Sequence, residues 1–322
     1  MNRQIDVLVM TSSIFHMEEK NQEIIRKTYS EVNLTVINQE EATEEMIDKA
    51  EIIFGCPRVD FLAKARNLKW LQLHSAGADR YANKDYYCNK EVRVTNMSGV
   101  FGLPIAEHVF AMMLSFNRNL QEYAYQKLEH RWNGIDGTRD FYGATLGIIG
   151  LGDIGNEIAK RAKAFGARVL AVKRTKTDMP EYVDELYLTE NMDEVLKQSD
   201  YVVLALPSTG KTKGIITEEK LRIMKPGAFL VNIGRGALID QDALIKALSE
   251  HWIAGAGIDV TTPEPLPQDS KLWDAPNLIL TPHTSGGSPT NDQRRFNIFI
   301  ENLNHYLKNE TLKNVVDFKE GY

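Results

Sequence analysis

The sequence predicts an α/β protein with two parallel-sheet domains, each doubly wound with helices on both faces. Three observations predict this architecture. Short apolar runs alternate with helical patterns in both halves of the chain, and spaced glycines near the middle join one such run to a helical pattern. The length of 322 residues is that of about two domains.

The first part of the chain predicts the smaller domain. Strand-like runs lie at 6–10, 34–37, 52–54, 70–74 and 92–95, and helical segments at 18–30, 43–49 and 60–65. Because strands that alternate with helices form a parallel sheet covered by helices, we expect a flavodoxin-like domain here.

The rest of the chain predicts one connecting helix and a second alternating unit. The helix is expected as a single segment from Leu103 to about His130. Strands are expected at 145–149, 168–172, 201–206, 228–233, 253–260 and 278–281, and helices at 154–165, from 192, from 217 and at 241–251, the last with Asp240 as N-cap. A final helix, 289–308, is expected to return to the first domain. The expected domains are therefore 1–99 with 288–322, and 100–287.

The glycine-rich turn at 150–155 follows a strand and opens a helix. Gly150 allows a tight turn, Gly152 lets a diphosphate approach the backbone, and Gly155 lets the helix pack against the strand. Asp153 and Ile154 begin the helix, whose N-terminal N–H groups and dipole favour an anion. A second strand follows the helix, so the context predicts a dinucleotide-binding domain of the Rossmann kind.

The second strand of this unit ends in a basic cluster rather than an acidic residue. Units that prefer NAD place a carboxylate at this position for the ribose 2′-hydroxyl. Here Lys173, Arg174 and Thr175 stand there, a set that suits a 2′-phosphate. We therefore expect NADP to be preferred, with NAD possible. Further cofactor contacts are expected just after two later strands, at Pro207, Thr212, Ile233 and Gly234.

Composition excludes several classes of function. The net charge of −6 gives no support for nucleic-acid binding or for an anionic membrane surface. No apolar stretch approaches the length of a membrane span, and the apolar run near the N-terminus is expected to be a strand rather than a signal peptide. The cysteines Cys56 and Cys88 are unpatterned, so neither a disulfide framework nor a metal site is expected, and cytoplasm is the expected location.

Three loops that follow strands of the second unit carry candidate reactive groups. Arg235 lies between glycines, Glu264 lies between prolines, and His283 follows a proline. Hydride transfer at a C–OH group needs a proton carrier, and His beside a carboxylate is a natural one at neutral pH. Arg provides a fork that matches a carboxylate. Together these groups predict chemistry on a 2-hydroxy acid.

The chain resembles the D-isomer-specific 2-hydroxyacid dehydrogenases, which include D-3-phosphoglycerate dehydrogenase and the glyoxylate/hydroxypyruvate reductases. The matching segments are 75–79 (SAGAD), 96–99 (NMSG), 106–107 (AE), 147–155 (GIIGLGDIG), 206–209 (LPST), 232–236 (NIGRG), 257–260 (GIDV), 263–265 (PEP) and 281–283 (TPH). The resemblance implies Arg235 as substrate anchor, His283 as general acid/base and Glu264 as its partner. It also implies a contact of Asp259 with the nicotinamide carboxamide, a substrate-carboxylate site at the backbone of Ser75, Ala76 and Gly77, and a homodimer built on the interdomain helix.

Alternatives to a reductase of small 2-oxo acids stay open at this point. The same fold occurs in C-terminal binding protein corepressors, which are dinucleotide-responsive binding proteins, although this chain has no added low-complexity segments for partners. Oxidation of formate or phosphonate fits less well. His74 adjoins the expected substrate loop and is a further candidate, whereas His108 lies in a largely apolar helix and is interpreted as structural.

Overall fold

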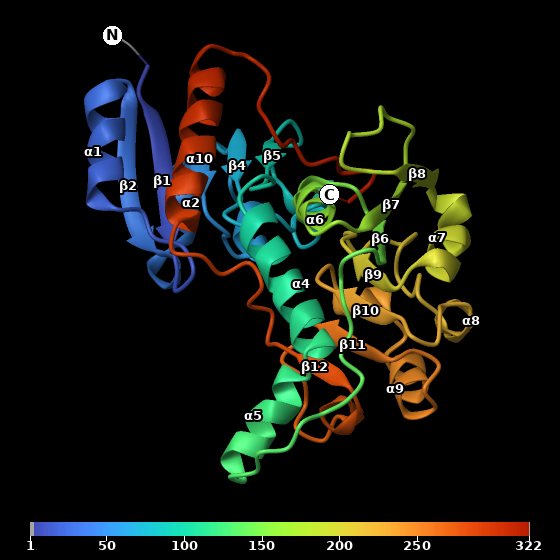
Figure 1. Ribbon diagram of the computed structural model, residues 1–322. Helices are drawn as coiled ribbons and strands as arrows, with labels where there is room; N and C mark the ends of the chain where they lie inside the picture. Colours follow the sequence, from blue (N-terminus) through green and yellow to red (C-terminus); the bar gives the residue numbers. More distant parts are fainter. Residues whose placement is uncertain (1–2, 322) are drawn as a thin grey trace. The chain divides into compact units, whose positions relative to one another are not determined.

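A computed structural model describes residues 3–321, and these form two compact units (Figure 1). Unit 1 takes the chain up to residue 101 and from residue 288 onward, and unit 2 takes residues 102–287. Each unit has its own parallel sheet. The described residues hold no helix that is both long enough and apolar enough to cross a bilayer.

Unit 1 is the flavodoxin-like domain. Its five parallel strands lie in the order β2-β1-β3-β4-β5, which is the flavodoxin order. The elements are β1 (Ile5–Thr11), α1 (Glu19–Thr28), β2 (Val32–Asn38), α2 (Glu44–Lys49), β3 (Ile52–Phe54), α3 (Val59–Leu62), β4 (Trp70–Gln72), β5 (Arg93–Thr95) and α10 (Asn291–Leu307).

Helix α10 belongs to unit 1 although it comes from the far end of the sequence (Figure 1). Its Phe299 ring stacks on Phe54 of β3 at 4.5 Å between centroids and on Trp70 of β4 at 5.5 Å. All three side chains are fully buried. Because each large apolar side chain that leaves water contributes about 1.5–3 kcal/mol, this aromatic stack joins the last helix to the first sheet.

Unit 2 is the Rossmann domain. Its seven parallel strands lie in the order β12-β11-β10-β9-β6-β7-β8. Chain order reverses at β6, which lies between β7 and β9, and ligands of such sheets bind at this switch point. The elements are α4 (Gly102–Asn117), α5 (Leu120–Leu128), β6 (Thr145–Ile149), α6 (Asp153–Ala164), β7 (Arg168–Lys173), β8 (Glu185–Leu188), α7 (Met192–Gln198), β9 (Tyr201–Leu204), α8 (Glu218–Arg222), β10 (Phe229–Asn232), α9 (Gln241–Ser249), β11 (Gly255–Ile258) and β12 (Leu278–Leu280).

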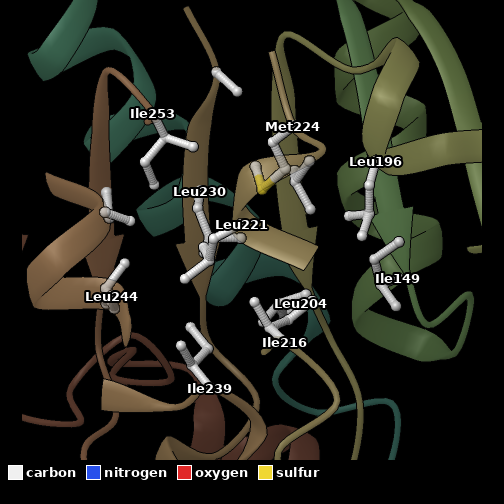
Figure 2. Packing of buried hydrophobic residues seen from close by; sticks show 14 of the residues in the cluster. Ile149, Leu196, Leu204, Ile216, Leu221, Met224, Leu230, Ile239, Leu244 and Ile253 are labelled. Carbon is white, nitrogen blue, oxygen red and sulfur yellow. The ribbon is translucent and has the colours of Figure 1, made fainter. Parts of the chain in front are cut away.

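One face of this sheet packs against α7, α8 and α9 in a continuous apolar core (Figure 2). Leu204 and Leu230 project from the strands, and Leu196, Leu221 and Leu244 meet them from the three helices. All five are at most 1% exposed. This core holds the strands in fixed register, so the loops at their carboxyl ends start from rigid positions.

The predicted single helix from Leu103 to His130 is wrong, because the chain forms α4 and α5 with a break between them. Asn119 takes a left-handed conformation with φ 53°, which an α-helix does not continue. The last residue of α4, Asn117, is buried and accepts a hydrogen bond from the Tyr201 hydroxyl at 2.7 Å. Strand β8 was missed, because its half-buried sequence has no continuous apolar run.

Candidate active site

The glycine-rich turn has three glycines with different surroundings. A Cβ on Gly150, whose φ is 111°, would lie 2.5 Å from the Ala205 carbonyl oxygen, and one on Gly155 would lie 2.2 Å from the Gly150 carbonyl oxygen. A Cβ on Gly152 would meet no atom within 4 Å. Gly150 and Gly155 therefore allow tight backbone packing, whereas Gly152 faces open space at the N-terminus of α6. This arrangement fits a dinucleotide diphosphate.

The loops after β9 and β10 lie against each other. A Cβ on Gly234 would lie 2.6 Å from the Leu206 carbonyl oxygen, so glycine is needed for this approach. The Thr212 hydroxyl donates to the Pro207 carbonyl at 2.7 Å and closes the first loop on itself. Ile233, at the start of the second loop, is buried. Of the expected cofactor contacts in these loops, Thr212 thus has a clear structural role.

Asn232 holds the turn that presents Arg235. Its side chain is buried, donates to the Arg235 carbonyl at 2.9 Å and accepts from the Gly234 N–H at 3.1 Å. A Cβ on the next residue, Gly236, would lie 2.1 Å from the Thr261 carbonyl carbon. The Arg235 loop is therefore in backbone contact with the loop that carries Glu264, and the structure brings these two predicted loops together.

Glu264 and His283 form a hydrogen-bonded pair. His283 Nδ1 lies 2.8 Å from Glu264 Oε2, and Glu264 Oε1 accepts from the Thr261 N–H at 3.0 Å. The side chains of His283 and Glu264 are 50% and 38% exposed. Because Glu264 takes Nδ1, Nε2 is the ring nitrogen left to face a substrate.

Asp259 organises the loop around His283. Its buried carboxylate accepts from the N–H groups of Thr284 at 2.9 Å and Ser285 at 3.0 Å. Its backbone carbonyl accepts from the His283 N–H at 2.7 Å. The Asp259 side chain is 0% exposed. The carboxylate therefore holds the backbone of the His283 loop, and its contact with a nicotinamide carboxamide stays a prediction.

Gln241 fixes the loop of Glu264 from the other side. This first residue of α9 accepts from the Thr262 N–H at 2.9 Å and donates to the Thr262 carbonyl. The two hydrogen bonds satisfy both backbone groups of Thr262 and so fix the backbone two residues before Glu264. Neither Gln241 nor Asn232 was singled out by sequence, because an amide that acts through hydrogen bonds to loop backbone has no distinctive pattern.

The basic cluster lies at the carboxyl end of β7 and in the loop that follows. Lys173 ends the strand, is paired with Leu188 of β8 and is half-buried. Arg174 and Thr175 are exposed in the loop that follows. Asp178 and Glu181, the acidic residues nearest in sequence, lie in the same loop and are exposed as well.

The candidate substrate loop of unit 1 follows β4. The Ser75 hydroxyl donates to the Gly77 carbonyl at 2.9 Å, and the Ser75 carbonyl accepts from the Met97 N–H at 2.9 Å. Sequence reasoning missed Arg295, a buried arginine of α10. It donates to the His74 carbonyl at 3.0 Å and so fixes the residue before this loop.

His74 itself is buried against the Phe15 ring. Burial, with a smaller contribution from the positive charge of Arg295, lowers the pKa of His74 to about 4. The imidazole is therefore neutral near pH 7, which argues against His74 as a proton donor.

Comparison with known proteins identifies the family. Residues 110–285 match the family described as D-isomer specific 2-hydroxyacid dehydrogenase, NAD binding domain. The chain belongs to the D-isomer specific 2-hydroxyacid dehydrogenase family. It is similar to glyoxylate reductase of Pyrococcus furiosus, with 36% identity over 286 residues that cover 86% of this chain and 77% of that protein.

Solved structures of the family share the fold of this chain. A D-isomer specific 2-hydroxyacid dehydrogenase family protein from Aeromonas salmonicida is 32% identical, with a TM-score of 0.85 and coverage of 98% of this chain and 99% of that one. A family member from Xanthobacter autotrophicus, solved with NADPH and MES, is 27% identical, with a TM-score of 0.84 and the same coverage. The chain described here is therefore an NAD(P)-dependent 2-hydroxyacid oxidoreductase. The corepressor alternative is not favoured.

Proposed function

We propose that the protein reduces a small 2-oxo acid, of the size of glyoxylate or hydroxypyruvate, to the D-2-hydroxy acid. The observation that carries this proposal is the pair of His283 Nδ1 and Glu264 Oε2 at 2.8 Å, on loops of the domain that carries the glycine turn. The name of the Pyrococcus furiosus relative, glyoxylate reductase, supports the substrate size.

When bound, a nicotinamide cofactor would supply the hydride for the carbonyl carbon of the substrate. His283 donates a proton from Nε2 to the carbonyl oxygen, and the product is the 2-hydroxy acid. Glu264 orients the ring through its hydrogen bond with Nδ1. The reverse reaction needs the neutral ring as base, so the direction of the reaction sets which protonation state is active.

The substrate carboxylate is expected to bind the Arg235 guanidinium, whose planar fork suits two carboxylate oxygens. For unit 1 taken by itself, the backbone N–H groups of Ser75, Ala76 and Gly77 are proposed as binding groups for a substrate carboxylate. On this proposal residues 1–99 with 288–322 form the substrate domain, and residues 100–287 form the dinucleotide-binding domain.

We further propose that NADP(H) is preferred over NAD(H). Arg174 and Thr175 lie exposed just beyond β7, where the adenosine ribose of a Rossmann domain is bound, and Lys173 adds positive charge there. No carboxylate ends this strand, so a 2′-phosphate meets attraction rather than repulsion.

A homodimer in the cytoplasm is the proposed state of the protein. Helix α5 and the segment after it expose apolar side chains at Leu120, Tyr125, Leu128 and Trp132, and Trp132 is 99% exposed. Tyr123 and Trp132 also line a hollow of about 670 Å³. Such a set of exposed apolar groups is typical of an interface, and a second copy of this chain is the proposed partner. Light scattering that shows a monomer would remove this proposal.

The experiment that tests the reaction is an assay of NADPH and NADH oxidation with a panel of 2-oxo acids. A separate assay with formate measures whether formate reduces NADP or NAD. Turnover of glyoxylate or hydroxypyruvate is expected. A panel in which only phosphohydroxypyruvate or a bulky acid reacts would refute the proposed substrate size. Binding of NADPH with no turnover on any acid would instead favour a binding protein.

The cofactor preference is tested by kcat/KM for NADPH against NADH in wild type and in Arg174→Ala. Loss of the fork should lower kcat/KM for NADPH by about tenfold or more and leave NADH unchanged. Arg66→Ala, which removes an exposed arginine of unit 1, is the matched control. A wild-type preference for NADH would overturn the proposal.

A further inference from the structure

We infer that His108 and Thr281 are positioning residues of the reaction, which act on His283 through the buried carboxylate of Asp259. The inference rests on the proposed role of His283 as proton donor. All four residues belong to unit 2, and the contacts between them lie within that unit.

The chain of contacts runs from α4 to the His283 loop. His108 Nε2 lies 3.1 Å from Thr281 Oγ1, and the Thr281 hydroxyl donates to Asp259 Oδ1 at 2.6 Å. The same carboxylate accepts the N–H groups of Thr284 and Ser285. Asp259 thus links His108 and Thr281 to the two residues that follow His283.

The hydrogen positions follow from the donors available. A hydroxyl has one hydrogen, and the Thr281 hydroxyl gives it to the carboxylate, which only accepts. His108 Nε2 must therefore carry the hydrogen of its contact with Thr281 Oγ1. His108 Nε2 also lies 4.0 Å from Asp259 Oδ1; the Asp259 side chain is fully buried and that of His108 is 23% exposed, so water screens this contact only in part.

His283 needs this support because its backbone is strained. Its φ is 54°, a left-handed conformation that costs a residue with a Cβ about 1 kcal/mol or more. Such a conformation persists only where the surroundings hold it. The hydrogen bond from the His283 N–H to the Asp259 carbonyl holds one side, and the Asp259 carboxylate holds the other side through Thr284 and Ser285.

Removal of the Thr281 hydroxyl therefore leaves a buried carboxylate oxygen with fewer donors than it has now. A buried charge that loses a hydrogen bond draws in water or moves, and either change releases the loop. Loss of the His108 ring acts one step further away, because Thr281 Oγ1 loses its donor and the hydroxyl is free to rotate. The proton donor is then misplaced while the glycine turn at 150–155 is untouched.

The test compares matched variants of each position. Thr281→Val keeps the shape and removes the hydroxyl, and Thr281→Ser keeps the hydroxyl. His108→Leu removes the ring donor, and His108→Gln keeps an N–H at similar reach. We expect the Val and Leu variants to lose about tenfold or more in kcat for the 2-oxo acid, while the Ser and Gln variants retain kcat within about threefold. The dissociation constant for NADPH, measured by fluorescence without substrate, should stay within about twofold in all four.

A combined variant separates positioning from a general loss of stability. Because both residues act on the same carboxylate oxygen, His108→Leu with Thr281→Val should lose about as much kcat as Thr281→Val alone. Independent structural damage would multiply the two losses. Equal kcat in the Val and Ser variants, or an NADPH dissociation constant that rises with the loss of kcat, would overturn the inference.

Failure of the proposed function gives a different pattern. If His283→Ala retained kcat, the proposed proton donor would be wrong and the positioning role would fall with it. If His283→Ala lost kcat and Thr281→Val and His108→Leu did not, only the positioning role would be wrong.

Discussion

Gly152 and Gly155 of the dinucleotide turn predict different outcomes for the same substitution, because only Gly152 faces open space. Gly152→Ala adds a Cβ that meets no atom within 4 Å, at φ −93° and ψ −156°, a conformation that alanine adopts. Gly155→Ala adds a Cβ 2.2 Å from the Gly150 carbonyl oxygen. The first change should therefore spare the fold and damage cofactor binding, and the second should damage the fold.

The magnitudes follow from these surroundings. Gly152 is the N-cap of α6, where alanine is poorer than glycine, so Gly152→Ala should lower the free energy of unfolding by about 0.5–1 kcal/mol. Gly155→Ala forces backbone apart in a close-packed turn, which costs about 1–3 kcal/mol, offset by about 1 kcal/mol from the better helix propensity of alanine. Because the added Cβ would overlap backbone rather than the end of a flexible side chain, the cost lies toward the upper end of that range, and the net loss should be about 2 kcal/mol.

Cofactor binding separates the two variants. A methyl group at Gly152 occupies the space through which a diphosphate would reach the N–H groups of α6, and we expect its dissociation constant for NADPH to rise by at least about tenfold, or about 1.4 kcal/mol. Urea unfolding of the free protein measures stability, and NADPH fluorescence measures affinity. A Gly152→Ala variant with wild-type affinity would refute this assignment of the diphosphate site.

Three further outcomes are expected. His283→Ala should lose about a hundredfold or more in kcat in steady-state assays, and an unchanged kcat would contradict the role of His283. Reduction by the wild type consumes a proton, so its rate should fall at alkaline pH while the rate of oxidation rises. Arg235→Ala should lower kcat/KM for the 2-oxo acid by about a hundredfold with NADPH affinity retained, and a loss confined to NADPH binding would contradict its role as anchor. The pKa of His74, about 4 against the usual 6.5, means that the folded state resists protonation. The contribution of His74 to the free energy of unfolding is then full above pH 6.5 and falls as the pH drops toward 4. Between pH 7 and pH 5, the free energy of unfolding in urea should fall by about 2 kcal/mol more in wild type than in His74→Gln. Equal losses would contradict the burial argument.

Much of the fold could be predicted because strands buried on both faces are continuous apolar runs. The segment 52–54 is β3, and the predicted N-cap of α9 is confirmed, since the Asp240 side chain accepts from the Ala243 N–H. The prediction of a single connecting helix was wrong because one residue changes the direction of the backbone. Asn119 ends a long helical pattern by its left-handed φ, and nothing in the apolar periodicity around it marks that position.

The reactive groups of the candidate site could be predicted because their chemistry is rare in loops after strands. The structure brings Glu264 and His283 into contact and joins their loops to that of Arg235. The residues that hold these loops could not be predicted, because amides such as Asn232 and Gln241 act through backbone contacts. Such a contact depends on tertiary packing, which a linear pattern does not record.

The site separates exposed reactive groups from buried supports. The His283 side chain is half exposed, as a group that meets a substrate must be, whereas the Asp259 side chain that fixes its loop is fully buried. A half-exposed ring held by one carboxylate would sample several orientations, since a single surface ion pair contributes about 0–1 kcal/mol. The hydrogen bonds from the His283, Thr284 and Ser285 N–H groups instead fix the backbone below the ring. Orientation of the proton donor therefore depends on the buried carboxylate at least as much as on the visible partner Glu264, and this is why substitutions at Thr281 should affect turnover without any contact with substrate.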